Sequence, residues 1–340
     1  MTALASSLLA VTMFTGCSAP APSAAPDGSS PKVTIGIGGQ TVLTYLPTTL
    51  AAQLGYYEEE GLDVELQDLQ GGSKALTALV GGSVQIASGY YEHTIQMQAK
   101  RQNIKSFVQM GKSPALALVV APGKTDEIKS LQDLKGKSVG VTAPGSSTHM
   151  LLLYLLEQEG MEATDVSVVA MGAGSSAIAA MESGDVVAGV MLEPDITVLA
   201  EKSGSPTRTL ADTRTPEGVK DLYGTDTWSS SCFYAKTEWL EANPKTAQKL
   251  ANAIKKALQY IADHDGTEIA AQMPEEFTGG DAERYAKLIE GLKPQLTTDG
   301  RNTEEGTEAV LDTQRVANPE VGEKKIDLSK TFTNEFVGGK

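Results

Sequence analysis

Two stretches of the sequence, GSKALTALVGGSV at residues 72–84 and GSSAIAAMESGDV at residues 174–186, share one pattern of small and apolar residues. Glycine followed by serine opens both stretches, and a glycine followed two residues later by valine closes both. The paired positions keep one offset, 174 − 72 = 102. Since the order of the surrounding elements also repeats, we favour duplication over a chance match in Ala/Gly-rich sequence.

The segments around each stretch predict the same alternation of strands and helices. A strand precedes each stretch, the stretch forms a helix, and a second strand follows it. The expected strands cover 33–37, 64–69, 84–88, 138–141, 166–171 and 186–191, with helices over 47–54, 73–80 and 176–183 and one ending at 157. Alternating strands and helices are typical of α/β lobes with mostly parallel sheets.

After Gly224 the pattern changes from alternation to helices. A strand is expected over 228–236, and Asn243-Pro244 predicts a helix start with asparagine as the cap. Further helices are expected near 283–292 and 303–316. Because this part cannot form a sheet domain alone, we expect it to return to the first lobe. Lobe I then comprises residues 32–116 and 228–340 and lobe II residues 117–227, with two hinge crossings near 114–120 and 229–234.

Composition excludes several classes of protein. The 340 residues contain 43 acidic and 28 basic side chains, which gives a net charge of −15. So acidic a chain is not expected to bind nucleic acid, which requires clustered Lys and Arg. Two cysteines cannot supply a disulfide framework, and no apolar run after residue 20 is long enough to span a bilayer.

The N-terminus reads as an export segment. Residues 4–14 are apolar or small and lead to Thr15-Gly16-Cys17, which resembles a bacterial lipobox although Phe14 departs from its pattern. No Lys or Arg precedes the apolar run, which is a second departure. We expect a signal peptide over 1–16, lipidation of Cys17, and a Pro/Ala/Ser tether over 17–31. The alternative is a buried apolar segment with Cys17 as a bystander.

Several motifs, in this order, resemble the substrate-binding proteins of ABC importers in the nitrate/sulfonate/taurine and thiamine-pyrimidine group (SsuA/THI5-like, NMT1). They are LGYYEEEGLDV (54–64), GGS (71–73), ALVGG (78–82), DLKGK (133–137), VGV (139–141), APGSSTH (143–149), Glu193-Pro194, EWL (238–240) and Asn243-Pro244. The resemblance covers residues 32 to 337. It implies a two-lobed periplasmic-binding-protein type II fold with a ligand in the cleft, which closes on binding.

Candidate ligand-binding residues lie in loops that follow strands, where open α/β sheets bind ligands. These residues are Gln40, Tyr45, Gly72, Ser73, Tyr90, Tyr91, Ser146, Ser147, Thr148, His149, Gly174 and Glu193. The Gly/Ser helix starts are suited to an anion, because their N–H groups are free. The alternative for these helix starts is simple N-capping without a ligand, and the alternative for the tyrosines is packing in the core. For Glu193 the alternative is a first-turn carboxylate that offsets the helix dipole.

The expected function is capture of a small molecule and its delivery to an ABC permease in the cytoplasmic membrane, with the receptor exported and lipid-anchored. A small organic anion (a sulfonate, taurine or a nitrate-like ion) is favoured, and a thiamine-precursor pyrimidine is the alternative. An enzyme on the same fold is a more distant alternative, since Ser146 or Ser147 with His149 lacks a Gly-x-Ser-x-Gly elbow. The cysteine-rich motif of the self-modifying THI5-like relatives is absent, and no cofactor or metal site is expected.

Overall fold

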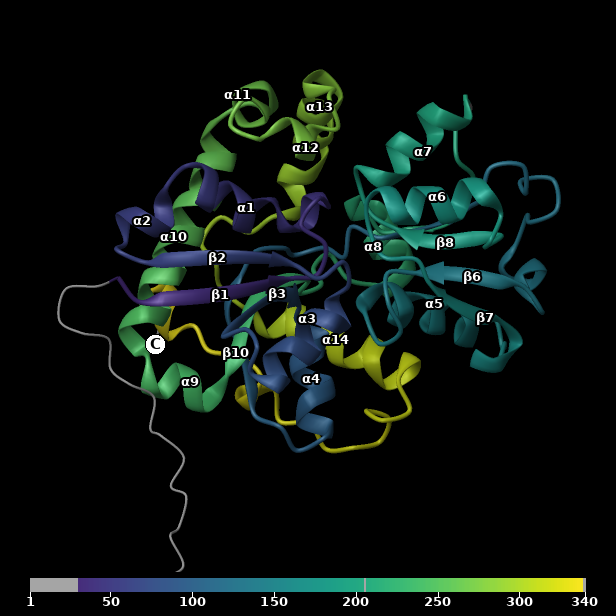
Figure 1. The fold of residues 1–340 in the computed structure, drawn as a ribbon. Coiled ribbons are helices and arrows are strands. Elements are labelled where there is room, and N and C mark those ends of the chain that lie inside the picture. The colour runs from purple at the N-terminus through teal and green to yellow at the C-terminus, as the bar shows by residue number, and fades with distance from the viewer. Residues whose placement is uncertain (1–29, 205, 339–340) are drawn as a thin grey trace, which may run out of the picture. The chain divides into compact units, whose positions relative to one another are not determined.

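A computed structural model describes residues 30–204 and 206–338, and it contains two five-stranded sheets (Figure 1). The expected export segment, Cys17 and most of the tether lie outside these residues. The sheet of lobe I has the order β2 (Asp63–Asp68), β1 (Lys32–Ile37), β3 (Ile86–Tyr90), β10 (Ser231–Lys236) and β4 (Ile104–Gln109). The sheet of lobe II has the order β7 (Ser167–Ala170), β6 (Ser138–Val141), β8 (Ala188–Met191), β5 (Ala117–Val120) and β9 (Thr209–Asp212).

The two sheets have equivalent topology, which confirms the α/β fold with two lobes. β1 pairs in parallel with β2 and β3, and β6 pairs in parallel with β7 and β8. β10 and β5 are antiparallel to both of their neighbours, so each sheet is mixed. These two strands are the ones that enter each lobe from the other lobe, and for this reason they run against the rest. The boundaries of the lobes, 32–116 with 228–340 and 117–227, remain a proposal.

The two repeated stretches form equivalent helices, α3 (Gly72–Gly81) and α6 (Ser175–Ser183). Ala75 in α3 and Ala177 in α6 are buried against the sheets, which explains the shared small residues. Gly82 and Gly184 end the helices with φ of 81° and 78°, a left-handed conformation that favours glycine.

The C-terminal part packs on lobe I, as expected. α10 (Pro244–Asp263) buries Leu250, Ile254, Leu258 and Ile261 and contacts α1 (Leu46–Gln53). Asn243 precedes α10, but its side chain donates to the Trp239 carbonyl instead of capping the helix. The other helices are α2 (Tyr56–Glu59), α4 (Glu92–Ala99), α5 (Ser147–Gln158), α7 (Asp195–Ser203), α8 (Pro216–Tyr223), α9 (Thr237–Ala242), α11 (Gly266–Ala270), α12 (Glu275–Thr278), α13 (Ala282–Leu292) and α14 (Glu304–Ala317).

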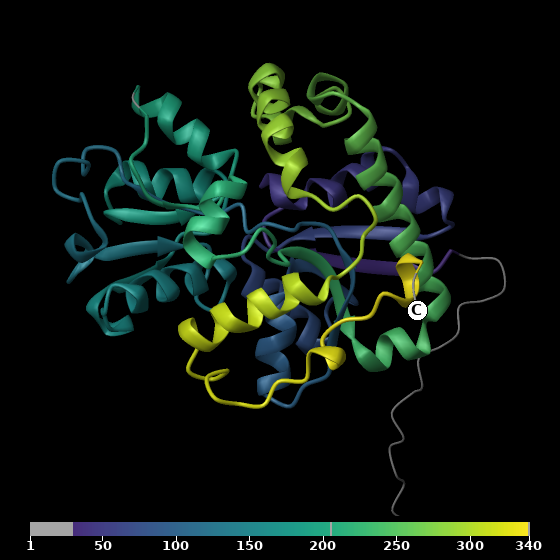
Figure 2. The same ribbon diagram turned by 180° about the vertical axis from the view of Figure 1, so that it is seen from behind.

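Two segments cross between the lobes and pair with each other. The Trp228 N–H donates to the Lys112 carbonyl at 2.9 Å, and the Ser230 N–H donates to the Gly111 carbonyl at 3.0 Å. A Cβ at Gly111 would lie 2.2 Å from the Ser230 Oγ, so the close approach of the crossings requires glycine. The segments run antiparallel to each other. Helix α14 also contacts α5 of lobe II, and Figure 2 shows this yellow helix extending toward the teal elements.

Candidate functional site

The lobes contact each other through the loops that follow their strands. The Ser73 N–H donates to the Ser146 Oγ at 2.9 Å, and the Ser146 hydroxyl donates to the Ser73 Oγ at 3.1 Å. A second hydrogen bond joins the Leu43 N–H to the Glu193 carbonyl at 2.8 Å. The structure therefore brings together the helix starts at Ser73 and Ser146, which the sequence places in one cleft.

Close packing around this contact depends on Gly72. A Cβ at this position would lie 2.9 Å from the His93 Cε1 and 3.8 Å from the Ser146 Oγ. Ser147, the next residue along α5, is also buried. The absence of a side chain at Gly72 therefore lets α3 pack against His93 of α4, while the distance to Ser146 would be an ordinary van der Waals contact.

Two further predicted residues of α5 make their hydrogen bonds inside lobe II. The Thr148 Oγ1 accepts from the Thr142 N–H at 3.0 Å, and the two hydroxyls lie 2.8 Å apart. The His149 Nδ1 accepts from the Gly145 N–H at 3.0 Å. These contacts stabilise the loop after β6, and a ligand role for Thr148 or His149 stays a prediction.

The helix start at Gly174 is occupied by a carboxylate from its own lobe. The Gly174 N–H donates to the Asp195 Oδ2 at 2.7 Å. Burial raises the pKa of Asp195 to about 6, although the bond from Gly174 acts in the opposite direction. This contact is the N-capping that the sequence offers as the alternative to ligand binding. Gly174 therefore differs from Ser73, whose N–H donates to a residue of the other lobe.

The predicted tyrosines are buried in lobe I. The Tyr90 hydroxyl donates to the Pro114 carbonyl at 2.6 Å, and its ring makes an edge contact with Tyr45. The Tyr91 hydroxyl bonds to the Thr331 Oγ1 in the C-terminal segment. These are the contacts of the core-packing alternative, and a ligand role for the tyrosines stays a prediction. Gln40, in the loop after β1, is half-buried, and its N–H donates to the Asp68 Oδ1 at 3.1 Å.

A pocket of about 180 Å³ opens beside these loops, and both lobes line it. Its apolar wall comes mainly from leucines of the loop after β1, the loop after β8 and helix α13. Its charged wall is formed by residues at the ends of β8 and β9 in lobe II. The lining residues are Leu43, Thr44, Ala115, Leu192, Glu193, Asp212, Arg214, Thr215, Lys287, Leu288, Gly291, Leu292 and Gln295.

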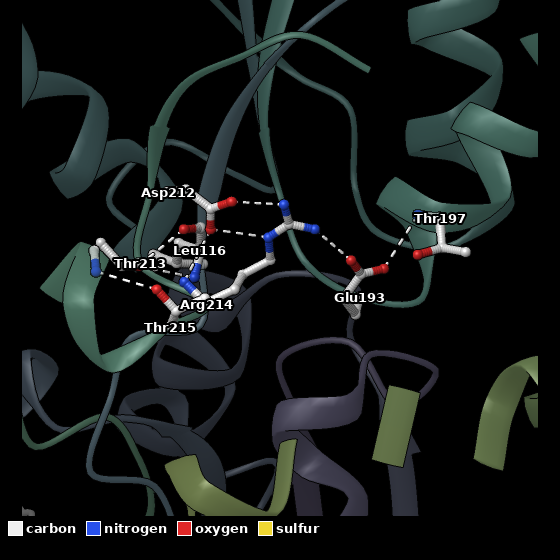
Figure 3. Close-up of polar contacts among 8 residues, drawn as sticks. Leu116, Glu193, Thr197, Asp212, Thr213, Arg214 and Thr215 are labelled. Atoms are coloured by element: carbon white, nitrogen blue, oxygen red, sulfur yellow. Dashed lines mark hydrogen bonds and ion pairs between the residues drawn. The ribbon is translucent and has the colours of Figure 1, made fainter. Parts of the chain in front are cut away.

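The charged wall centres on Arg214, which lies between two carboxylates (Figure 3). Its guanidinium bonds to the Glu193 Oε1 on one side, and on the other its Nε lies 2.9 Å from the Asp212 Oδ1 and its Nη2 lies 2.6 Å from the Asp212 Oδ2. The hydrogen bonds that Arg214 donates to Asp212 raise the pKa of Arg214, with a further contribution from Glu193. The Glu193 Oε2 accepts from the Thr197 N–H at 3.1 Å in the first turn of α7. We name Glu193, Asp212 and Arg214 the charged triad.

The triad carries a net charge of −1, and its groups are incompletely buried. The side chains of Arg214, Glu193 and Asp212 are 25%, 18% and 32% exposed. Three of the five guanidinium N–H groups are used in these bonds, so two remain for a ligand acceptor. Sequence reasoning identified Glu193 but missed Asp212 and Arg214, whose only signal is a position at the end of a short strand.

An ion pair joins the lobes at the edge of this pocket. The Arg284 Nη1 of α13 lies 2.8 Å from the Glu201 Oε2 of α7. Lys287 and Leu288, one turn further along α13, line the pocket. Helix α13 of lobe I thus contacts lobe II and covers one side of the pocket.

Within residues 30–204 and 206–338, no group of three metal-ligating side chains comes together. No helix in the same ranges has the length and apolar character needed to cross a membrane.

Comparison with known proteins gives relatives of two kinds. A Bacillus subtilis (strain 168) protein, YtlA, whose binding role is itself only provisional, is 26% identical over 255 residues, which are 74% of this chain and 72% of the relative. A 4-amino-5-hydroxymethyl-2-methylpyrimidine phosphate synthase of Aspergillus parasiticus is 28% identical over 238 residues, 68% of this chain and 67% of the synthase.

Solved structures support the fold. A protein from Bordetella bronchiseptica RB50 is 38% identical, with a TM-score of 0.86 over 90% of this chain and 95% of that one. The alkanesulfonate-binding protein SsuA from Xanthomonas axonopodis pv. citri, bound to MOPS, has a TM-score of 0.68 at 18% identity and covers 86% of this chain and 96% of its own. The second likeness confirms the periplasmic-binding-protein type II fold. Residues 44–267 match the family described as NMT1/THI5 like, and the chain belongs to this family.

Proposed function

We propose that the protein is the solute-binding component of an ABC importer and that it holds a small molecule between its lobes. The observation that carries the proposal is the pocket of about 180 Å³, which residues of both lobes line beside the paired crossings. A ligand that contacts both lobes favours the closed form over the open form. Apolar walls with a few placed polar groups are typical of small-molecule sites.

Delivery requires a membrane partner and, in our proposal, a lipid anchor. An ABC permease in the cytoplasmic membrane would accept the ligand from the closed receptor. Cys17 would carry the acyl chains and hold the exported protein at the membrane surface. We expect Cys17→Ala to move the protein from the membrane fraction to the soluble fraction without changing its fold. Equal membrane association of the variant and the wild type would contradict the anchor.

For the ligand class, the charges around the pocket favour a nitrogen heterocycle with an amino group, such as an aminopyrimidine, over an anion. Glu193 and Asp212 outnumber Arg214 in the triad, and the neighbouring Lys287 forms an ion pair with Glu283. An amino group can donate to Glu193, while a ring nitrogen can accept from the free N–H groups of Arg214. The 28% identity to a pyrimidine phosphate synthase agrees with this class.

The small organic anion that the sequence favours is the second candidate. Its support is the contact between the helix starts at Ser73 and Ser146, where N–H groups and helix dipoles suit an anion. The structural neighbour SsuA, which is 18% identical to this chain, is named an alkanesulfonate-binding protein. An anion at this position would have to displace the direct bond between the two serines.

Calorimetry on the wild type and three variants separates the two ligand classes. Loss of one hydrogen bond to a charged group costs about 1.5–3 kcal/mol, or roughly ten- to a hundred-fold in affinity. We expect Glu193→Gln to weaken aminopyrimidine binding by that amount, while the exposed Glu162→Gln, remote from the pocket, leaves it unchanged. If the ligand is a sulfonate, Ser73→Ala should weaken binding and Glu193→Gln should leave it equal or tighter.

Native mass spectrometry of the protein purified from its own host would identify a ligand that it carries. Incubation of that ligand with the protein also tests the enzymatic alternative, since a receptor releases the ligand unchanged. Appearance of a product would contradict a pure binding role. If neither an aminopyrimidine nor a sulfonate binds, and the purified protein carries no ligand, the proposed receptor function is contradicted.

A further inference from the structure

A carboxyl group without a charged partner is buried where the lobes meet. Glu92, the first residue of α4, has a relative exposure of 0%. Neither of its carboxyl oxygens completes a hydrogen bond with the described residues. The Ser147 hydroxyl of lobe II interacts with Glu92 across the contact and opposes part of the effect of burial on its pKa.

The groups around Glu92 carry no compensating charge. Helix α4 contributes His93, whose pKa burial lowers to about 4, so this ring is neutral above pH 5. The other titratable groups that interact with Glu92 are four phenols and a thiol, and burial raises the pKa of each. They are Tyr45 of η1 (Leu43–Tyr45), Tyr90 of β3, Tyr223 of α8, and Tyr234 and Cys232 of β10. No Lys or Arg in the described ranges forms an ion pair with Glu92.

Burial of an unpaired carboxylate is costly, and the group responds by taking up a proton. Burial raises the pKa of Glu92 to about 8 from an ordinary value of 4.5. Part of this burial comes from lobe II, because Ser147 and Tyr223 both belong to that lobe. Separation of the lobes would admit water on that side and restore the charged form.

We propose that closure of the lobes takes up one proton at Glu92, so that low pH favours the closed form and high pH the open form. The sign follows from linkage, because the pKa of Glu92 is higher in the closed state than in the open state. Between these two pKa values the closed state binds the proton and the open state does not. The stabilisation of the closed state is therefore lost as the pH rises through the pKa of the closed state. One proton changes the closed-to-open ratio by at most about tenfold per pH unit. This coupling does not depend on which ligand the pocket takes.

Small-angle scattering of the whole ligand-free protein between pH 5 and pH 9 tests the coupling. We expect the radius of gyration of the wild type to increase as the pH rises, and that of Glu92→Gln to stay at the low-pH value throughout. The control Glu241→Gln changes the same charge on the exposed surface of α9 and should behave as the wild type. A wild-type radius that does not change with pH, or a transition that persists in Glu92→Gln, would overturn the proposal.

A second variant guards against misfolding of Glu92→Gln. Ser147→Ala removes the hydroxyl that favours the ionised form of Glu92, so its opening transition should shift to higher pH. An unshifted or downward-shifted transition would count against Glu92 as the titrating group. Since no ligand is present, failure here leaves the proposed receptor function untouched, and failure of ligand binding leaves the proton coupling untouched.

Discussion

Two parts of the contact between the lobes differ in their chemistry. The first part, the serine contact, consists of Ser73, Ser146, Ser147 and Glu92, and it contains hydroxyls and an unpaired carboxyl. The second part is the pocket with the charged triad, where Arg214 is paired on both sides and remains 25% exposed. From this difference we propose two roles: the buried part with the hydroxyls brings the lobes together, and the charged, open part receives the ligand.

Replacement of the central cation of the triad should have the largest effect on stability. Arg214→Met leaves Glu193 and Asp212 incompletely buried and without a counter-ion. Loss of one partner of a buried ion pair costs 3–5 kcal/mol, and the exposure of this triad reduces that to about 2–3 kcal/mol. Denaturant unfolding measures the change. Lys202→Met, which breaks only the exposed pair with Glu182, should lose less than about 1 kcal/mol.

Equal losses in these two variants would contradict the difference drawn between the pocket and the surface. A loss in Arg214→Met that is accompanied by unchanged ligand affinity would place the ligand elsewhere in the cleft.

Much of the fold was predictable from local pattern. The strand over 138–141 coincides with β6, and the helix that begins after Asn243 matches α10. The repeated Gly-Ser stretches are helices because each has a buried apolar face and ends at a left-handed glycine. The mixed sheets were not predicted, since the direction of β5 and β10 depends on how the chain crosses between lobes.

The site was less predictable, because it depends on proximity that no motif encodes. Asp212 ends β9, Arg214 lies two residues further on, and Glu193 follows β8. They meet only because both strands flank β5. In the sequence Glu92 looks like an ordinary first-turn carboxylate, and no motif signals its contact with Ser147 of lobe II. The contact of Tyr91 with Thr331 was also not predictable, because the two residues lie more than two hundred positions apart in the chain.

Loss of the serine contact should have an intermediate effect, on closure more than on global stability. Ser146→Ala removes both hydrogen bonds to Ser73, which should weaken the closed form by about 1–2 kcal/mol. Scattering at pH 5 should then show a larger radius of gyration than the wild type. Among the described residues, the Ser183 hydroxyl bonds only to the Ala180 carbonyl and the Asp185 N–H of its own lobe. Ser183→Ala should therefore not change the radius, and an equal change in both variants would refute a specific role for Ser146.

The smallest effect is expected at the ion pair between α13 and α7. Glu201→Gln removes the exposed partner of Arg284, and such pairs contribute about 0–1 kcal/mol. The loss should shrink further in high salt, because salt screens exposed charges. A large effect that does not respond to salt would mean that α13 holds the lobes closed, and the serine contact would lose that role.

A reversible lock across the serine contact tests most directly the claim that the ligand binds between the lobes. Ser73→Cys with Ser146→Cys, in the Cys17→Ala chain, places two thiols where the hydroxyl oxygens lie 3.1 Å apart, and the remaining Cys232 is buried. Calorimetry would use whichever probe, aminopyrimidine or sulfonate, binds the reduced protein. We predict that oxidation abolishes binding and that reduction restores it. Equal affinity in the oxidised and reduced protein would contradict a ligand site between the lobes.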